Sequence, residues 1–271
     1  MNIVLFVIFE LILIFLLIYI LTKKKKIQNN DLEIKNNKKK LDVAVIVEPR
    51  KDKMLIKVIK NYLKLLPNET KIQIFHGTKN KKFIKKYFKK EIDSNKISLS
   101  NLKVKNLNIK EYNRLLTSED FYNKINGENI LIFQMDTGLC SKTDNKIEDF
   151  LEYDYVGAPW SNQETVFYND LENNVKEYTL KNKVGNGGLS FRKKSQILKF
   201  IKEKKYDGEP EDVYFSKSNF FNYPNVDVAS KFSTEFLLNK KSYGYHAAFK
   251  ILNDEEKLIF GESCPEFNMF L

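Results

Sequence analysis

The run NILIFQMDTGLC, residues 129–140, joins a continuous apolar stretch to a carboxylate. Residues 129–134 are predicted to form a strand, because consecutive large apolar residues fit a strand that is buried on both faces. Asp136 follows at the predicted exit of that strand. The position suits either a turn aspartate before Gly138 or a functional carboxylate, and the surrounding sequence bears on the choice.

Strand and helix patterns alternate upstream of this run. Residues 42–47 are β-branched and almost continuously apolar, and residues 51–66 carry apolar side chains at helical spacing. The elements predicted next are a strand at 71–76, a helix at 80–90, a strand at 102–107 and one or two helices at 109–125. The alternation predicts an α/β fold with a doubly wound sheet, in which ligands bind beyond the carboxyl ends of the strands. Asp136 lies at such an end.

The N-terminus predicts a membrane anchor over residues 1–21. The apolar run Ile3–Leu21 contains one charge, Glu10, and as a helix it would span about 28 Å, close to the thickness of a bilayer core. A cleavable signal peptide is the alternative, but the basic front and the small-residue cleavage site are missing. Residues 22–41 are rich in Lys and Asn without periodicity, which predicts a basic polar linker.

The flanks of the predicted span indicate its orientation. Lys23–Lys26 follow it directly, and the positive-inside rule then places the C-terminal domain in the cytosol. The sequon Asn68-Glu69-Thr70 is the one sign of a lumenal position. We therefore expect a single-pass membrane protein whose catalytic domain is cytosolic rather than lumenal.

Charge and cysteine content limit the possible partners. The chain has 271 residues and a formal charge of +11, but only three of its residues are Arg. Proteins that bind nucleic acids usually read the bases with Arg side chains as well as Lys. We expect no nucleic-acid partner, and a membrane-tethered nucleic-acid protein is the weakest alternative. Cys140 and Cys264 are the only cysteines, too few for a disulfide framework and without the C-x-x-C spacing of a zinc site. This content is compatible with a reducing compartment.

Three short stretches in the second half carry residues suited to chemistry. The glycine-rich segment 185–188 is either a tight turn or a place where the backbone approaches a sugar or phosphate closely. Glu211-Asp212 either begins a helix, where acidic residues are favoured, or supplies a general base. His246 is one of two histidines, and we interpret the other, His76, as structural.

Taken together, these stretches resemble a family. The chain resembles GT-A-type glycosyltransferases, and in particular a glycosyltransferase-like family of unknown function that is frequent in large DNA viruses, over about Val43–Phe249. The motifs that carry the resemblance are VIVEPR, YNRLLTS, ILIFQMDT, YDYVGAPW, VGNGGLSFR, EDVYFS and GYH.

The resemblance implies a GT-A-like domain over residues 42–271, with a doubly wound, mixed, Rossmann-like sheet preceded by one transmembrane helix. It implies a membrane-anchored enzyme that moves a sugar from a nucleotide-sugar donor to a hydroxyl acceptor on a glycan or protein. Inversion at the sugar and assistance by a divalent metal are part of the same expectation. The alternative is a catalytically inactive domain of the same fold that binds a glycan or a nucleotide.

The resemblance also implies roles for particular residues. Asp212 is the expected catalytic base, supported by Glu211. Asp136 and His246 are the expected ligands of Mn²⁺ or Mg²⁺, although Gln134 stands where the usual Asp-x-Asp motif has its first aspartate. The residues expected to bind donor or acceptor are Glu48, Arg50, Gln134, Trp160, Asn186, Gly187 and Gly188. For Trp160, stacking on a sugar and burial at a corner of the fold remain open.

Overall fold

The computed structural model describes residues 40–160, 165–169, 175–181 and 183–271, together with Lys23. The predicted membrane anchor and almost all of the predicted linker lie outside the described residues. Among the described helices, none is both long enough and apolar enough to cross a bilayer. A compact unit spans Lys40–Leu271, and Leu41, which the sequence places in the linker, is buried in its core.

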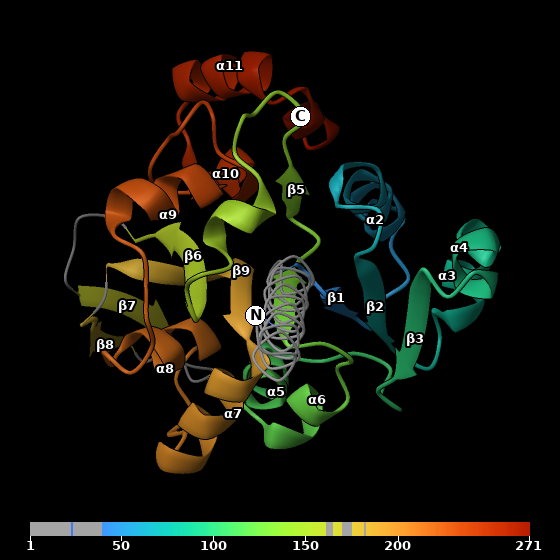
Figure 1. Ribbon diagram of the computed structural model, residues 1–271, viewed down its shortest axis with the longest axis horizontal. Coiled ribbons are helices and arrows are strands. Elements are labelled where there is room, and N and C mark those ends of the chain that lie inside the picture. The colour runs from blue at the N-terminus through green and yellow to red at the C-terminus, as the bar shows by residue number, and fades with distance from the viewer. Residues whose placement is uncertain (1–22, 24–39, 161–164, 170–174, 182) are drawn as a thin grey trace, which may run out of the picture. The chain divides into compact units, whose positions relative to one another are not determined.

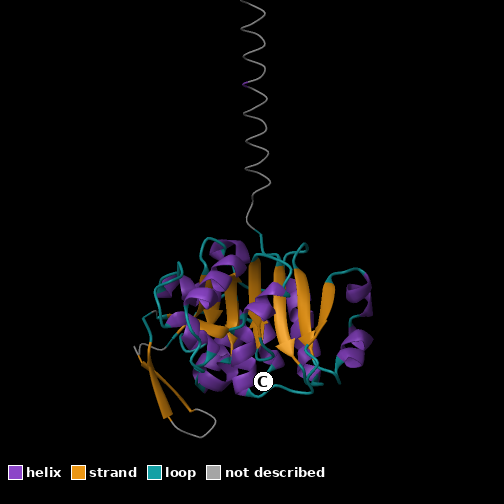
Figure 2. Ribbon diagram, turned by 90° about the horizontal axis from the view of Figure 1, so that it is seen from below, coloured by secondary structure: helices purple, strands orange, loops and turns teal. Residues whose placement is uncertain are grey.

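Six described strands form the central sheet of this unit (Figures 1 and 2). Their spatial order is β3 (Ile97–Asn101), β2 (Lys71–His76), β1 (Val43–Glu48), β4 (Asn129–Phe133), β9 (Val184–Lys193) and β6 (Tyr155–Pro159). The first four are mutually parallel, whereas β9 runs antiparallel to both of its neighbours. The prediction of an α/β fold with a mixed sheet is confirmed.

The sheet is buried on both faces because its strands are apolar at consecutive positions. In β1, Ala44 and Ile46 belong to one apolar core, whereas Val43, Val45 and Val47 belong to another. Alternate side chains of a strand point to opposite faces, so the two cores lie on opposite sides of the sheet. A strand with this pattern needs helices over both faces.

Helices cover each face, as Figure 1 shows. The first core includes side chains of α2 and α9 and the residues around α3 and α4, and the second includes side chains of α6, α7 and α8, with α5 beside them. The bounds on the first face are α2 (Lys53–Leu65), α3 (Lys81–Tyr87), α4 (Lys89–Asp93), η1 (Ile147–Phe150) and α9 (Val226–Phe232). The bounds on the second face are α5 (Ile109–Leu116), α6 (Glu119–Asn123), α7 (Lys194–Glu203) and α8 (Glu211–Ser216).

A small sheet extends the fold beyond β4. Its strands are β10 (Ser233–Thr234), β11 (Gly244–His246) and β5 (Thr137–Leu139), and the last elements of the chain, α10 (Ala248–Ile251), α11 (Asp254–Ser263) and η2 (Pro265–Met269), pack beside it. A separate hairpin consists of β7 (Thr165–Asn169) and β8 (Val175–Thr179). The small sheet positions two candidate site residues: Asp136 directly precedes β5, and His246 is the last residue of β11.

Helix α2 fixes the start of β5. The Asn61 amide group donates to Leu139 O and accepts from Leu139 N, at 3.0 and 2.8 Å. The next residue of α2 is Tyr62, whose hydroxyl lies 2.8 Å from Thr137 Oγ1, and Thr137 Oγ1 in turn donates to Gln134 O. These buried contacts hold the loop between β4 and β5, and therefore the backbone of Asp136.

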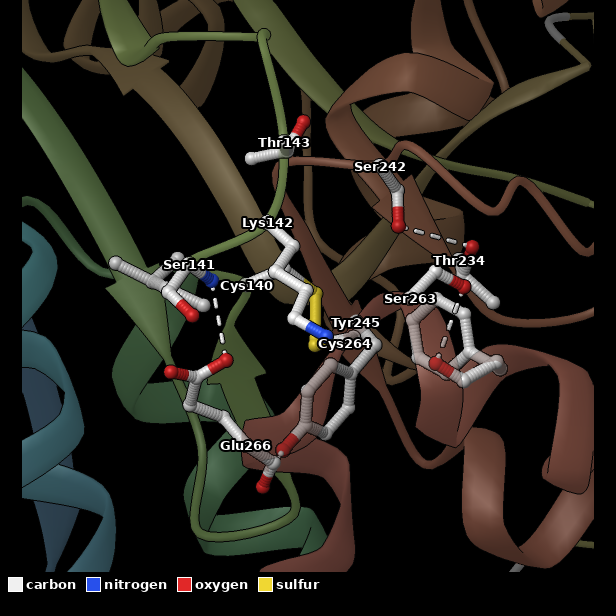
Figure 3. The surroundings of a disulfide bond; sticks show 12 residues. Cys140, Ser141, Lys142, Thr143, Thr234, Ser242, Tyr245, Ser263, Cys264 and Glu266 are labelled. Atoms are coloured by element: carbon white, nitrogen blue, oxygen red, sulfur yellow. Dashed lines mark hydrogen bonds between the residues drawn. A yellow bond between two sulfur atoms is a disulfide. The ribbon is translucent and has the colours of Figure 1, made fainter.

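The two cysteines form a disulfide, which the sequence analysis did not expect. Cys140 directly follows β5 and Cys264 directly follows α11, 124 residues later. Figure 3 shows the bond beside Tyr245 and Glu266, and the Glu266 carboxylate accepts from Ser141 N at 3.0 Å. The disulfide thus ties the C-terminal helices to the segment behind Asp136.

Two predicted elements differ from the structure. Residues 102–107 do not form a strand, because β3 occupies Ile97–Asn101 and pairs with β2 there. The glycine-rich segment is not a tight turn but part of β9, the strand between β4 and β6. A Cβ at Gly157 of β6 would lie 2.1 Å from Asn186 O of β9, so these two strands approach closely where a side chain has no room.

We predict that the disulfide is present in the chain as extracted without reductant. Alkylation in urea should then modify neither cysteine before reduction and both afterwards, as read by intact mass spectrometry. The Cys140→Ser variant is the control, because its remaining Cys264 should alkylate without reduction. Alkylation of both cysteines in the unreduced wild-type chain would contradict the pairing.

Candidate active site

A cavity of about 1290 Å³ opens beyond the carboxyl ends of β1 and β4. The parallel strands β1 and β4 end there, and Glu235 and His246, from the region of the small sheet, also line the cavity. Nine of the residues singled out from the sequence line it: Glu48, Arg50, Gln134, Asp136, Asn186, Gly188, Glu211, Asp212 and His246. Gly187 and Trp160 are not among the lining residues.

Asp136 lies three residues beyond the end of β4 and is largely enclosed. Its Oδ2 accepts a hydrogen bond from Lys250 Nζ at 2.7 Å, and its Oδ1 lies 3.6 Å from His246 Nε2. Burial alone would raise the pKa of this carboxyl, but His246 and Lys250 outweigh it and hold the pKa below its usual value. Asp136 is therefore a charged carboxylate that two cationic groups already contact.

His246 ends β11 and is enclosed by acidic groups. Its Nδ1 lies 3.1 Å from Glu235 Oε1, an ion-pair distance at which the angles do not make a hydrogen bond. Burial alone would lower the pKa of the imidazole. The carboxylates of Glu235 and Asp136 outweigh burial and raise this pKa to about 9. A Cβ at Gly188 would lie 2.2 Å from the ring, so glycine there makes room for the imidazole.

Asp212, the expected base, lies at the start of α8. Its carboxylate accepts from Val213 N at 2.8 Å and from Gly187 N at 3.4 Å. Burial, followed by the charge of the adjacent Glu211, raises its pKa to about 7. A carboxyl with this pKa changes its protonation state near neutral pH, which is the property a general base needs.

A buried ion pair holds the start of α8 against the sheet. Arg192, on β9, is completely buried and its Nη2 lies 3.0 Å from Glu211 Oε2. The guanidinium also donates to the Tyr122 hydroxyl at 2.8 Å and to Ser190 Oγ at 3.0 Å. Since Asp212 is the next residue after Glu211, this pair positions the candidate base.

Gly187 lies behind the two carboxylates. A Cβ at this position would be 2.3 Å from Glu211 Oε1 and 3.0 Å from Asp212 Cβ. The glycine in β9 therefore allows α8 to begin directly against the strand. This is a packing role at the edge of the site rather than a contact with the cavity.

Arg50 and Glu48 form a pair at the end of β1. Arg50 donates to both oxygens of Glu48, at 2.9 and 2.7 Å, while 58% of its side chain stays exposed. Asn80 fixes the loop by donating to the carbonyl oxygens of both residues. The cavity wall here thus presents a cation on a rigid turn.

Trp160 lies in a small apolar cluster with Leu180 and Val213, and only 4% of it is exposed. This position corresponds to the structural alternative, burial at a corner of the fold. Gln134 does line the cavity, and its amide donates to the Tyr112 hydroxyl at 3.1 Å.

The side chains around Asp136 do not fit the metal site that the GT-A pattern implies. Within the part of the chain that the structure describes, no three His, Cys, Asp or Glu side chains are arranged to hold a metal ion. Both oxygens of Asp136 face cationic groups, and the Gln134 amide is bonded elsewhere. The sequence analysis missed Lys250 and Glu235, and only the proximity of Lys250 to His246 in the chain could have indicated the former.

Several solved structures have a fold similar to that of this chain. The bifunctional glycosyltransferase WbbM, in its apo form, is similar over 85% of this chain with a TM-score of 0.50 and 10% identity. The chain spans about half of WbbM, 51% of its length. The apo-form glycosyltransferase GlyE of Streptococcus pneumoniae TIGR4 has a TM-score of 0.47 at 9% identity, with 85% of this chain and 63% of GlyE covered. HddC from Yersinia pseudotuberculosis has a TM-score of 0.43 at 11% identity, with 85% and 100% covered.

The similarity to WbbM shows that the α/β fold of this chain is similar to GT-A glycosyltransferase folds. Residues 78–246 match the family described as "Protein of unknown function (DUF5672)", and the chain belongs to this family. No curated protein sequence matches the chain.

We predict that Arg192→Met lowers the free energy of unfolding by about 3–5 kcal/mol, because Glu211 would remain buried without its partner. Urea unfolding followed by tryptophan fluorescence measures the loss. The matched control is Lys193→Met, which removes a partly exposed pair with Asp154 and should cost at most about 1 kcal/mol. Equal losses in the two variants would show that the buried pair does not hold α8.

Proposed function

We propose that the chain is a glycosyltransferase that moves a sugar from a nucleotide-sugar donor to a hydroxyl group of a glycan or protein. The observation that carries the proposal is the joint placement of Asp212 and the cations near Asp136 in one cavity. A negatively charged donor diphosphate fits the cationic side, and a base with a pKa of about 7 fits deprotonation of the acceptor hydroxyl.

In this mechanism each residue has a separate task. Arg50 and Lys250 attract the diphosphate, and Asp212 accepts the proton as the acceptor oxygen attacks the anomeric carbon. The bond from that carbon to the diphosphate breaks on the opposite face, which gives inversion. Glu211 holds its place through Arg192 and keeps the pKa of Asp212 high.

A catalytically inactive glycan- or nucleotide-binding domain is the second candidate. Its support is Gln134, which stands in place of the first carboxylate of the Asp-x-Asp pattern. Such a domain would bind nucleotide-sugars without releasing the nucleotide, even over long incubation with acceptors.

Membrane anchoring and compartment also belong to the proposal. The apolar run 3–21 supports a single-pass anchor. The Cys140–Cys264 disulfide supports an oxidising compartment for the domain, against the cytosolic position that the flanking lysines favour. The alkylation state of the chain taken directly from cells discriminates between them.

We predict that Asp212→Asn lowers turnover by about 10²–10⁴-fold, because the amide cannot accept the acceptor's proton. The full chain in detergent micelles is assayed for nucleotide release from UDP-, GDP- and CMP-sugars, and donor affinity is measured in parallel. Donor affinity should stay within about threefold of the wild type. The control Asp227→Asn alters an exposed carboxylate that does not line the cavity and should leave turnover unchanged. Loss of turnover and donor binding together would indicate a structural role for Asp212.

We predict a pH dependence set by the same carboxyl. The base acts in its ionised form, so the rate should rise with pH and level off above about 7, the pKa of Asp212. One unit below that pKa the rate should be roughly a tenth of the plateau. A profile of kcat/KM against pH measures this, and a rate that is flat down to about pH 5 would contradict the assignment, because the base would then have an ordinary carboxyl pKa.

A further inference from the structure

A lysine side chain contacts Asp136, the carboxylate that the GT-A resemblance assigns to a metal ion. Lys250 Nζ is 2.7 Å from Asp136 Oδ2, and both residues line the cavity. We propose that Lys250 neutralises the diphosphate of the nucleotide-sugar donor, so that donor binding in this chain needs no divalent cation. The proposal rests on the proposed function, because it assigns a residue to the donor site of that reaction.

The carboxylate that would hold a metal is already engaged. One oxygen of Asp136 bonds to Lys250 and the other faces His246 Nε2 at 3.6 Å. The residue two positions earlier, Gln134, has its amide bonded to the Tyr112 hydroxyl. A divalent ion prefers several oxygen ligands around it, and among the described residues no group of three His, Cys, Asp or Glu side chains is placed to supply them.

The backbone is shaped to bring Lys250 to this place. Ala247 adopts a left-handed conformation with φ 47°, which is uncommon for a residue with a side chain. Its N–H donates to Asp136 O at 2.9 Å, and its own carbonyl accepts from Lys250 N at 2.8 Å. The turn after β11 is thus bonded directly to the backbone of Asp136, and α10 starts from it. Such a turn fixes the lysine relative to the aspartate.

The neighbouring aromatic residues restrain the same short helix. Phe249 stacks on Phe270 with ring centroids 4.7 Å apart and an interplanar angle of 3°. Lys250 Nζ lies 5.2 Å from the centre of the Phe249 ring. The disulfide ties the segment that follows α11 to the residue after β5. The short helix that carries Lys250 is therefore held by aromatic packing, and the segment after it is held by the disulfide.

The ammonium group remains available to a ligand. The Lys250 side chain is 57% exposed, and an ammonium has three donors, of which Asp136 takes one. A phosphate oxygen could accept from the others while the contact with Asp136 persists. Arg50 provides a second cation on the same cavity wall, and its pKa is raised first by its bond to Glu48 and in part by the charge of Asp136. Lys250 and Arg50 therefore both line the cavity, each beside a carboxylate, Asp136 and Glu48.

The charge balance is consistent with this replacement. In an Asp-x-Asp site, two carboxylates neutralise a dication. Here Gln134 removes one negative charge and Lys250 supplies a single positive charge against Asp136. Glu235 balances the charge of His246 in the same way, so the group of four side chains is neutral before the donor binds, and the substitution of Gln134 and the placement of Lys250 compensate each other.

Calorimetric titration of the full chain in detergent micelles tests the proposal. The probes are UDP, GDP and inorganic pyrophosphate, each titrated in EDTA and again with Mn²⁺. We expect the wild-type chain to bind a diphosphate in EDTA with an affinity within about threefold of that in Mn²⁺. Lys250→Ala should weaken binding in EDTA by about tenfold or more, the effect of losing one charge-assisted hydrogen bond.

Two further variants test whether binding depends on the positive charge at position 250. Lys250→Arg should retain diphosphate binding in EDTA, because it keeps the positive charge. Lys240→Ala removes an exposed lysine that does not line the cavity and should bind as the wild type does.

Each other outcome is decisive. Binding that requires Mn²⁺ and is unchanged in Lys250→Ala would overturn this inference while leaving the proposed function intact. Binding in EDTA that Lys250→Ala does not weaken would overturn it as well. If no diphosphate binds in either condition, the proposed function fails and the inference fails with it.

Discussion

The candidate site depends on the ion pair between Arg192 and Glu211. Arg192 lies near the end of β9, between β4 and β6, is completely buried, and contacts Glu211 at the first residue of α8. Charges are costly to bury unless they are paired and fully hydrogen-bonded. Tyr122 and Ser190 accept from two further nitrogens of the guanidinium, Nη1 and Nε. The strand, the helix and the position of Asp212 are therefore fixed together.

The same constraint sets the chemistry of Asp212. Burial next to a second carboxylate raises its pKa to about 7. Because Arg192 neutralises Glu211, two adjacent carboxylates can occupy a site with little water. Glycine at position 187 leaves room for both, since any side chain would collide with Glu211. Strand, helix and glycine thus act as one unit.

Much of the fold could be predicted from the sequence, because the pattern of apolar residues within a single strand or helix indicates its conformation. The continuous apolar runs of β1 and β4 indicate strands buried on both faces, and the apolar spacing of α2 indicates an amphipathic helix. The strand predicted at 102–107 was wrong because polar Ser and Asn positions in β3 gave no apolar signal, although that strand pairs with β2. The glycine-rich stretch of β9 suggests a turn for a similar reason: its strand conformation comes from pairing with β6 and from the continuation of β9 into its pairing with β4, not from local preference.

The parts of the site that the sequence could not predict come from distant contacts. Lys250 meets Asp136 across 114 residues, and Cys140 meets Cys264 across 124. Contacts between residues so far apart in the chain follow no regular spacing, so a single sequence does not indicate them. The residues predicted through the family resemblance mostly line one cavity, but Trp160 is buried and is not among the lining residues. The predicted role of each lining residue stays a prediction until a ligand is observed.

A crystal structure of the chain with a bound nucleoside diphosphate tests the central claim most directly. The account predicts the diphosphate at the carboxyl ends of β1 and β4, with phosphate oxygens in contact with Lys250 and Arg50. Asp212 should then face the open space where an acceptor would bind. A diphosphate bound elsewhere on the domain, or one held at this place with Lys250 turned away from it, would contradict the account.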